Sequence, residues 1–278
     1  MVTQHTAAIG VDVGGSGIKA AVVEIASGRL TSDRLRIPTP TPSTPEVVSA
    51  AIGRLVRRLV KATDLPADTP VGVGLPGVAI AGRLLTAANI DPAWVDYPVA
   101  EKLTKTLKRQ VSIVNDADAA GIAEMRFGTG AGKRGVVIFL TLGTGVGSGV
   151  FTDGTLVPNT EFGQMEIRGR PAERRSAAAA RVRRGLSWKA WAADLDEHLE
   201  RIEDLMWPSL LILGGGVSKN ADRFIPRLHR RAPVVPAELR NDAGIIGAAI
   251  VAAEGLVDAA TTFDDLPAAT DAKRATTD

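Results

Sequence analysis

The sequence contains no cysteine, few aromatic residues and no long apolar run, and each absence excludes a class of protein. None of the 278 residues is cysteine, and aromatic residues make up only 4%. Without cysteine the chain can form neither a disulfide nor a cysteine-ligated zinc or iron–sulfur site, so we expect no zinc. So few aromatic rings supply no base-stacking platform, and we expect no nucleic-acid partner. No apolar stretch reaches the roughly 20 residues that span a bilayer, so we expect no membrane partner.

Charge is nearly balanced overall, at +2, but arginine is concentrated in two segments, residues 168–184 and 223–231. Such clusters attract polyanions by concentrating positive potential. A solvated, arginine-rich helix face explains them more simply, and it is the preferred interpretation from sequence alone. The first residues show no basic region followed by an apolar one, so we expect no secretory signal and a cytoplasmic location.

Short apolar runs typical of strands alternate with segments in which apolar residues recur at helical spacing. This alternation is typical of an α/β protein. We predict strands at 8–13, 18–23, 71–75, 111–114, 135–142, 146–151 and 209–213, and helices at 46–62, 97–107, 117–127 and 187–205. Two of these strand pairs enclose a glycine turn, and they lie in different halves of the chain. Their similarity predicts two related lobes with a cleft between them. The polar segment 258–278 is expected to be a disordered tail.

Three glycine-rich turns, at residues 12–19, 141–147 and 213–216, each follow an apolar strand. Glycine permits a positive φ and has no Cβ, so backbone N–H groups can turn toward an approaching anion. The turns therefore predict binding of phosphate groups. The residues assigned to this role are Gly14, Gly15, Ser16, Gly17 and Lys19 in the first turn, Gly143, Thr144 and Gly145 in the second, and Gly214, Gly215 and Gly216 in the third.

Two aspartates are candidates for chemistry beside these turns. Asp12 would repel a phosphate unless a cation lay between them, which predicts Mg²⁺ held through water; capping of the turn by Asp12 is an equal alternative. Asp116 follows Asn115 at the end of a predicted strand. It could take the proton of a substrate hydroxyl as a general base, or it could be the N-cap of the next helix.

Glu161 and Gln164 follow the second glycine hairpin. A carboxylate and an amide suit paired hydrogen bonds to neighbouring sugar hydroxyls. Taken alone, residues 161–164 are better explained as an ordinary polar turn.

Taken together and in this order, the motifs between residues 8 and 255 resemble the ROK family of sugar kinases. The resemblance implies a two-lobed actin/hexokinase-like (ribonuclease H-like) α/β fold. The implied lobes are residues 1–116, completed by a helix at 244–256, and residues 117–243. It also implies that Asp116 is the general base. The residues implied to contact the sugar are Asn89, Asn115, Asp116, Glu161, Gln164 and Glu173.

Two departures from the family pattern narrow the resemblance. Most members carry a cysteine cluster that binds structural zinc, which this chain cannot form. Segments 86–90, 186–191, 214–219 and 234–244 resemble the zinc-free branch, the polyphosphate glucokinases. The second departure is Gln164, where the family usually has histidine. Glutamine still forms hydrogen bonds but carries no proton charge, which leaves sugar preference open.

This resemblance implies a homodimeric enzyme that uses Mg²⁺ to transfer the terminal phosphoryl group of inorganic polyphosphate, and in some members of ATP, to O6 of glucose. An ATP-dependent glucokinase or glucomannokinase is the nearest alternative. A sugar-responsive repressor needs a DNA-binding domain before the first motif, and only eleven residues precede Asp12. A catalytically silent sugar-binding protein is the remaining alternative, and the presence of Asp116 argues against it.

Overall fold

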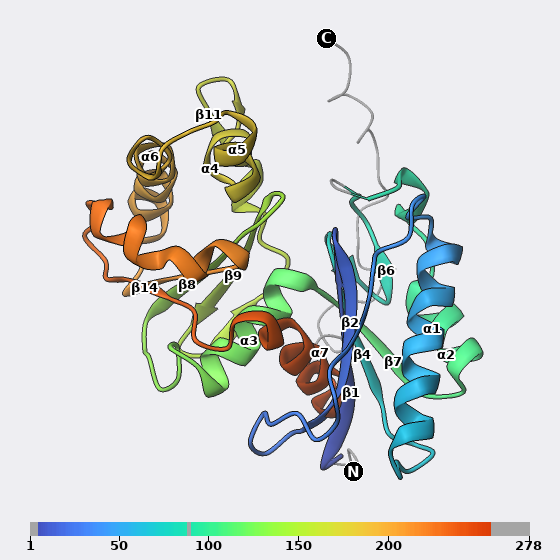
Figure 1. Cartoon of the computed structure of the whole chain (residues 1–278). Coiled ribbons are helices and arrows are strands. Elements are labelled where there is room, and N and C mark those ends of the chain that lie inside the picture. Colours follow the sequence, from blue (N-terminus) through green and yellow to red (C-terminus); the bar gives the residue numbers. More distant parts are fainter. Residues whose placement is uncertain (1–4, 88–89, 257–278) are drawn as a thin grey trace.

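The computed structural model describes residues 5–87 and 90–256, which form two mixed β-sheets with helices between and outside them (Figure 1). The first sheet has the strand order β3-β2-β1-β4-β7. Its strands are β1 (Ala7–Gly14), β2 (Gly17–Glu24), β3 (Leu35–Ile37), β4 (Val71–Leu75) and β7 (Val111–Asn115). β1 and β2 form an antiparallel hairpin, whereas β1, β4 and β7 run parallel to one another.

The second sheet repeats this plan in the order β10-β9-β8-β13-β14. Its strands are β8 (Val136–Leu142), β9 (Val146–Thr152), β10 (Thr155–Val157), β13 (Leu210–Gly214) and β14 (Val234–Pro236). β8 and β9 form the antiparallel hairpin, and β8, β13 and β14 are parallel. The predicted duplication of a strand–glycine turn–strand unit is therefore confirmed.

The helices cover both faces of each sheet. α1 (Pro45–Ala62) and α2 (Val99–Leu107) pack on the outer face of the first sheet, and α6 (Trp188–Met206) packs on the outer face of the second, beside α4 (Glu173–Ser176) and α5 (Ala178–Arg183). α3 (Asp116–Phe127) and α7 (Ala243–Glu254) lie between the sheets (Figure 1). None of the helices formed by residues 5–87 and 90–256 is both long and apolar enough to cross a membrane.

Short elements complete the fold. They are β5 (Ala79–Ile80), β6 (Arg83–Leu84), β11 (Glu166–Ile167) and β12 (Arg170–Pro171), with 3₁₀ helices η1 (Pro92–Trp94), η2 (Phe162–Gln164), η3 (Gly216–Arg223), η4 (Ile225–Arg227) and η5 (Arg240–Asp242). The predicted strands and helices are present, and their ends differ by up to two residues. The predicted tail at 258–278 lies outside the described residues.

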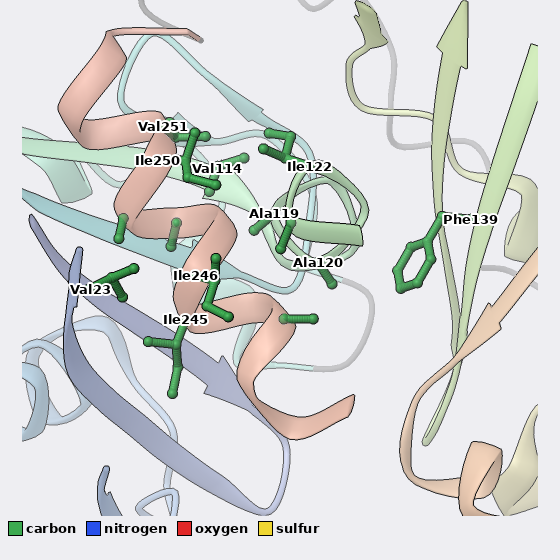
Figure 2. Close-up of a cluster of buried hydrophobic side chains, with 14 of the residues drawn as sticks. Val23, Val114, Ala119, Ala120, Ile122, Phe139, Ile245, Ile246, Ile250 and Val251 are labelled. Carbon is green, nitrogen blue, oxygen red and sulfur yellow. The ribbon is translucent and has the colours of Figure 1, made fainter. Parts of the chain in front are cut away.

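α7 is buried on nearly every side. Its side chains, among them Ile245, Ile246 and Ile250, belong to one apolar cluster with Val23 of the first sheet and Ala119 of α3 (Figure 2). This packing explains why the α7 sequence is apolar throughout and has no polar stripe.

Glycines let the backbone of α7 approach its neighbours closely. A Cβ atom on Gly72 of β4 would lie 1.8 Å from the carbonyl oxygen of Ala248, and one on Gly10 of β1 would lie 1.9 Å from that of Ile245. The last helix of the described chain thus covers the sheet formed by its first strands. α3 packs on both α7 and β9, so it joins the two halves of the molecule. The lobe boundaries at residues 116 and 243 remain a prediction.

Candidate active site

The three glycine turns meet at a cleft of about 320 Å³, within the size range of small-molecule sites. They follow the carboxyl ends of β1, β8 and β13, the edge at which open α/β sheets bind ligands. All the residues predicted to bind phosphate line this cleft except Gly17. Gly17 is buried, and a Cβ atom there would meet the guanidinium group of Arg36 at 2.8 Å.

The first two turns face one another across the cleft. The hydroxyl oxygen of Thr144 lies 3.7 Å from the place that a Cβ atom on Gly15 would take, and a Cβ on Gly143 would project into open space. Of the glycines predicted to bind phosphate, only Gly215 has a positive φ, of 82°. The expectation that glycine supplies positive φ is therefore wrong for the first two turns, where its contribution is the absence of a side chain.

Asp12 and Lys19 lie opposite each other on the β1–β2 hairpin, and both line the cleft. The ammonium nitrogen of Lys19 is 2.8 Å from Oδ2 of Asp12, so the lysine offsets part of the carboxylate charge. Within residues 5–87 and 90–256, no group of three or more acidic, histidine or cysteine side chains could hold a metal ion. A single carboxylate facing phosphate turns suits Mg²⁺, which commonly binds one or two carboxylates and otherwise water and substrate phosphate.

Asp116 is the first residue of α3, and Asn115 is the N-cap. Oδ1 of Asn115 accepts hydrogen bonds from the backbone N–H groups of Ala117 (2.8 Å) and Asp118 (3.0 Å). The alternative in which Asp116 caps the helix is therefore wrong, and its carboxyl group lines the cleft instead.

The pKa of Asp116 is raised from its ordinary value to about 7. Burial is the main cause, and the neighbouring carboxylates of Asp12 and Glu161 add to it. A carboxylate with this pKa can take a proton near neutral pH and release it again, as a general base requires.

Asn115, Asp116, Glu161, Gln164 and Glu173, all predicted to contact the sugar, line the same cleft. Glu173 accepts hydrogen bonds from the side-chain amide of Gln164 (3.2 Å) and the backbone N–H of Val146 (3.0 Å). Burial, with the nearby charge of Glu173, raises the pKa of Glu161. The side-chain amide of Asn115 donates to the carbonyl oxygen of Gly77 (3.0 Å). Asn89 lies outside the described residues.

Asn159 contributes a connection that the sequence analysis missed. Its side chain exchanges two hydrogen bonds with the backbone of Ala79, at 2.8 and 3.1 Å, and its own N–H donates to Oδ2 of Asp118 (2.8 Å). Asn159 therefore ties the loop before Glu161 to the first half of the molecule. Asn159 has a φ of 60°, which asparagine tolerates better than most residues. No sequence pattern indicated that its side chain would bond to the backbone of Ala79.

Asp118 allows a test of pH-dependent stability. It is 1% exposed, its Oδ1 has no hydrogen-bond partner among the residues that the structure describes, and burial raises its pKa to about 7. The folded protein therefore keeps a proton at Asp118 between about pH 4 and 7, where the unfolded chain has lost it, so stability is lost as the pH rises. We expect the free energy of unfolding of the wild type to fall more steeply from pH 5 to 8 than that of Asp118→Asn. Urea unfolding at each pH measures this, and parallel curves would contradict it.

Four of the eleven arginines in the two basic clusters pair with acids on α6, and Arg168 with Glu197 is one of these pairs. Arg175 and Arg184 pair with Asp194, and Arg230 pairs with Asp196. Others stack on tryptophan rings: Arg181 and Arg223 lie 3.9 and 5.3 Å from the ring centre of Trp188. These arginines therefore stabilise the surface of the second half of the molecule, which agrees with the preferred interpretation of the sequence.

Comparisons with known proteins agree with this geometry. Residues 8–166 match the model of the ROK family. The chain is 44% identical to the polyphosphate glucokinase of Mycobacterium tuberculosis (strain H37Rv), over 87% of this chain and 89% of that protein. It also resembles the inorganic polyphosphate/ATP-glucomannokinase of Arthrobacter sp. strain KM, with a TM-score of 0.86 and 46% identity, over 91% of this chain and 98% of that one. For a ROK family glucokinase of Streptomyces griseus in complex with glucose and AMPPNP, the TM-score is 0.77, with 27% identity over 88% and 99% of the two chains.

Proposed function

The chain belongs to the ROK family, and from this premise we propose that it transfers the terminal phosphoryl group of inorganic polyphosphate, and also that of ATP, to O6 of glucose. The observation that carries the proposal is the position of Asp116. Its carboxyl group, with a pKa of about 7, lines the same cleft as the phosphate turns and the sugar-side residues Glu161 and Gln164. The two-lobed fold and the relatives with kinase activity support the same reaction class.

In the proposed reaction, glucose lies between the two lobes with O6 toward Asp116. Asn115, Glu161, Gln164 and Glu173 bind the other hydroxyl groups, and the family resemblance adds Asn89. As the bond from O6 to phosphorus forms, the bond from phosphorus to the bridging oxygen of the donor breaks, and Asp116 takes the hydroxyl proton. The shorter donor leaves with the electron pair of the broken bond.

On the donor side, the three glycine turns bind phosphate oxygens through backbone N–H groups, and Lys19 contributes a positive charge. Asp12 is the residue that would hold Mg²⁺ through water. When bound, the ion would offset the negative charge of the donor phosphates. A homodimer and a cytoplasmic location remain predictions of the family resemblance.

The test is formation of glucose 6-phosphate from glucose and Mg²⁺ with either polyphosphate or ATP, at matched phosphate concentration. We expect kcat/KM to be higher with polyphosphate, because the Mycobacterium tuberculosis relative, at 44% identity, is named for that donor. An Asp116→Asn preparation controls for contaminating kinases. Turnover with ATP alone would favour the ATP-dependent glucokinase instead.

Mannose is a second candidate acceptor. The Arthrobacter relative is a glucomannokinase, and Gln164 replaces the histidine usual in the family. The same assay with mannose in place of glucose measures this preference, and the kcat/KM ratio of the two sugars decides it.

A further inference from the structure

Arg240 lines the cleft but has no role in the mechanism above. It lies in η5, just before α7, and its side chain is exposed. η5 packs against η3, the helix that begins at Gly216 in the third glycine turn. Arg240 therefore stands beside the third glycine turn, which the family resemblance assigns to the distal phosphates or the nucleotide of the donor.

The backbone of Arg240 is strained, with a φ of 52°. For a residue with a Cβ atom this conformation costs about 1–2 kcal/mol, whereas glycine adopts it freely. The long arginine side chain does not relieve this cost locally, as the short polar side chains of asparagine or aspartate can. Residues in such conformations also occur away from the cleft, as Lys108 does, so the position of Arg240 at the cleft and not its strain alone makes it a candidate ligand contact.

The surrounding structure holds the segment 238–242, which contains Arg240, on both sides. The carboxylate of Glu124, which is fully buried in α3, accepts hydrogen bonds from the backbone N–H groups of Leu239 (2.7 Å) and Glu238 (3.2 Å). On the other side, Asp242 pairs with Arg34 at 2.5 Å. Because Glu124 and Asp116 lie on the same helix, the position of Arg240 is fixed relative to the proposed base.

The guanidinium group of Arg240 is also available for a ligand. Among residues 5–87 and 90–256, no carboxylate pairs with it, whereas arginines of the basic clusters such as Arg175 and Arg230 are paired. Guanidinium groups match phosphate oxygens in a bidentate geometry. The chemistry at this end of the cleft therefore suits a chain of linked phosphates.

We propose that Arg240 binds the donor beyond the third glycine turn and makes the site selective for polyphosphate over ATP. The inference rests on the proposed function. In ATP the chain of phosphates ends and a neutral ribose and base follow. In polyphosphate the next unit is another anion, which the guanidinium group can bind.

The test compares Arg240→Gly with Lys108→Gly. Lys108 is an exposed cation at the end of α2 with a φ of 53°, so its replacement removes the same charge and relieves the same strain away from the cleft. We expect Arg240→Gly to raise KM for long-chain polyphosphate about 10- to 100-fold, as for loss of one charge-assisted contact. In Arg240→Gly, the KM values for ATP and for glucose should change by less than about threefold. The melting temperature of this variant should not fall. Lys108→Gly should leave all three KM values unchanged.

Equal KM values for polyphosphate in the two variants would overturn the inference, and so would equal losses for ATP and polyphosphate. Titration calorimetry with polyphosphate, without glucose, separates this outcome from failure of the proposed function. If the wild type binds polyphosphate but forms no glucose 6-phosphate from it, the proposed function fails. Weaker binding by Arg240→Gly than by Lys108→Gly would then still support Arg240 as the contact.

Discussion

Replacement of Asp116 by asparagine is expected to lower kcat about 10²- to 10⁴-fold, the contribution typical of a general base. The amide has nearly the same shape as the carboxyl group but cannot accept the O6 proton. Glucose binding, measured by calorimetry, should change little, because the other sugar-side residues stay in place. A matched control is Asp68→Asn, which makes the same change at an exposed loop position and should keep full activity.

The pH dependence of kcat/KM in the wild type is a second test of the role of Asp116. The pKa of Asp116 is raised to about 7, so the carboxyl group becomes protonated as the pH falls below that value. We expect kcat/KM to fall toward tenfold per pH unit on the acid side of this pKa, and the residual activity of Asp116→Asn to lack the transition. Loss of glucose binding in proportion to turnover, or an unchanged pH profile in the variant, would contradict the role of Asp116.

Gly72→Ala is expected to lower the stability of the protein strongly. A methyl group on Gly72 would lie 1.8 Å from the carbonyl oxygen of Ala248, so β4 and α7 would have to move apart. Overpacking of this kind costs about 3 kcal/mol. In a protein of this size that loss corresponds to a fall of roughly 6–12 °C in the melting temperature, measurable by calorimetry.

Gly53→Ala is the matched control and should raise the stability of the protein instead of lowering it. Gly53 lies inside α1, and a methyl group there would meet only the flexible end of Arg57, at 3.2 Å. Alanine should stabilise the helix by about 0.5–1 kcal/mol. A Gly72→Ala protein as stable as the wild type would show that the backbones of β4 and α7 can separate without cost.

The sequence was informative where a feature is local. Apolar strands followed by glycine turns predicted the two hairpins and the edge at which phosphate groups would bind. The helix that begins after Asn115 was also predicted, but not its N-cap. Asparagine and aspartate cap helices about equally well, so the pair Asn115–Asp116 left the choice open until the hydrogen bonds of Asn115 decided it.

Features that depend on distant parts of the chain were not predicted. Asn159 meets Ala79 across 80 positions, and Glu124 holds the turn before Arg240 from 115 positions away. No local pattern marks either pair. The backbone angles of the first two glycine turns were also misjudged, because glycine is required both for positive φ and for open space, and a sequence does not show which applies.

The position of α7 has a consequence for synthesis of the protein. The strands of the first sheet are complete when residue 115 is made, but the helix that covers their inner face ends at Glu254. At roughly 5–20 residues per second, the ribosome needs about 7–28 s to make the 139 residues between 115 and 254. During that interval the inner face of the nascent sheet, with Ala8, Ala21 and Val23, has no α7 to cover it. The first sheet must therefore wait for its cover until the strands of the second sheet have been synthesised, and a growing chain stalled before α7 would be a natural substrate for chaperones.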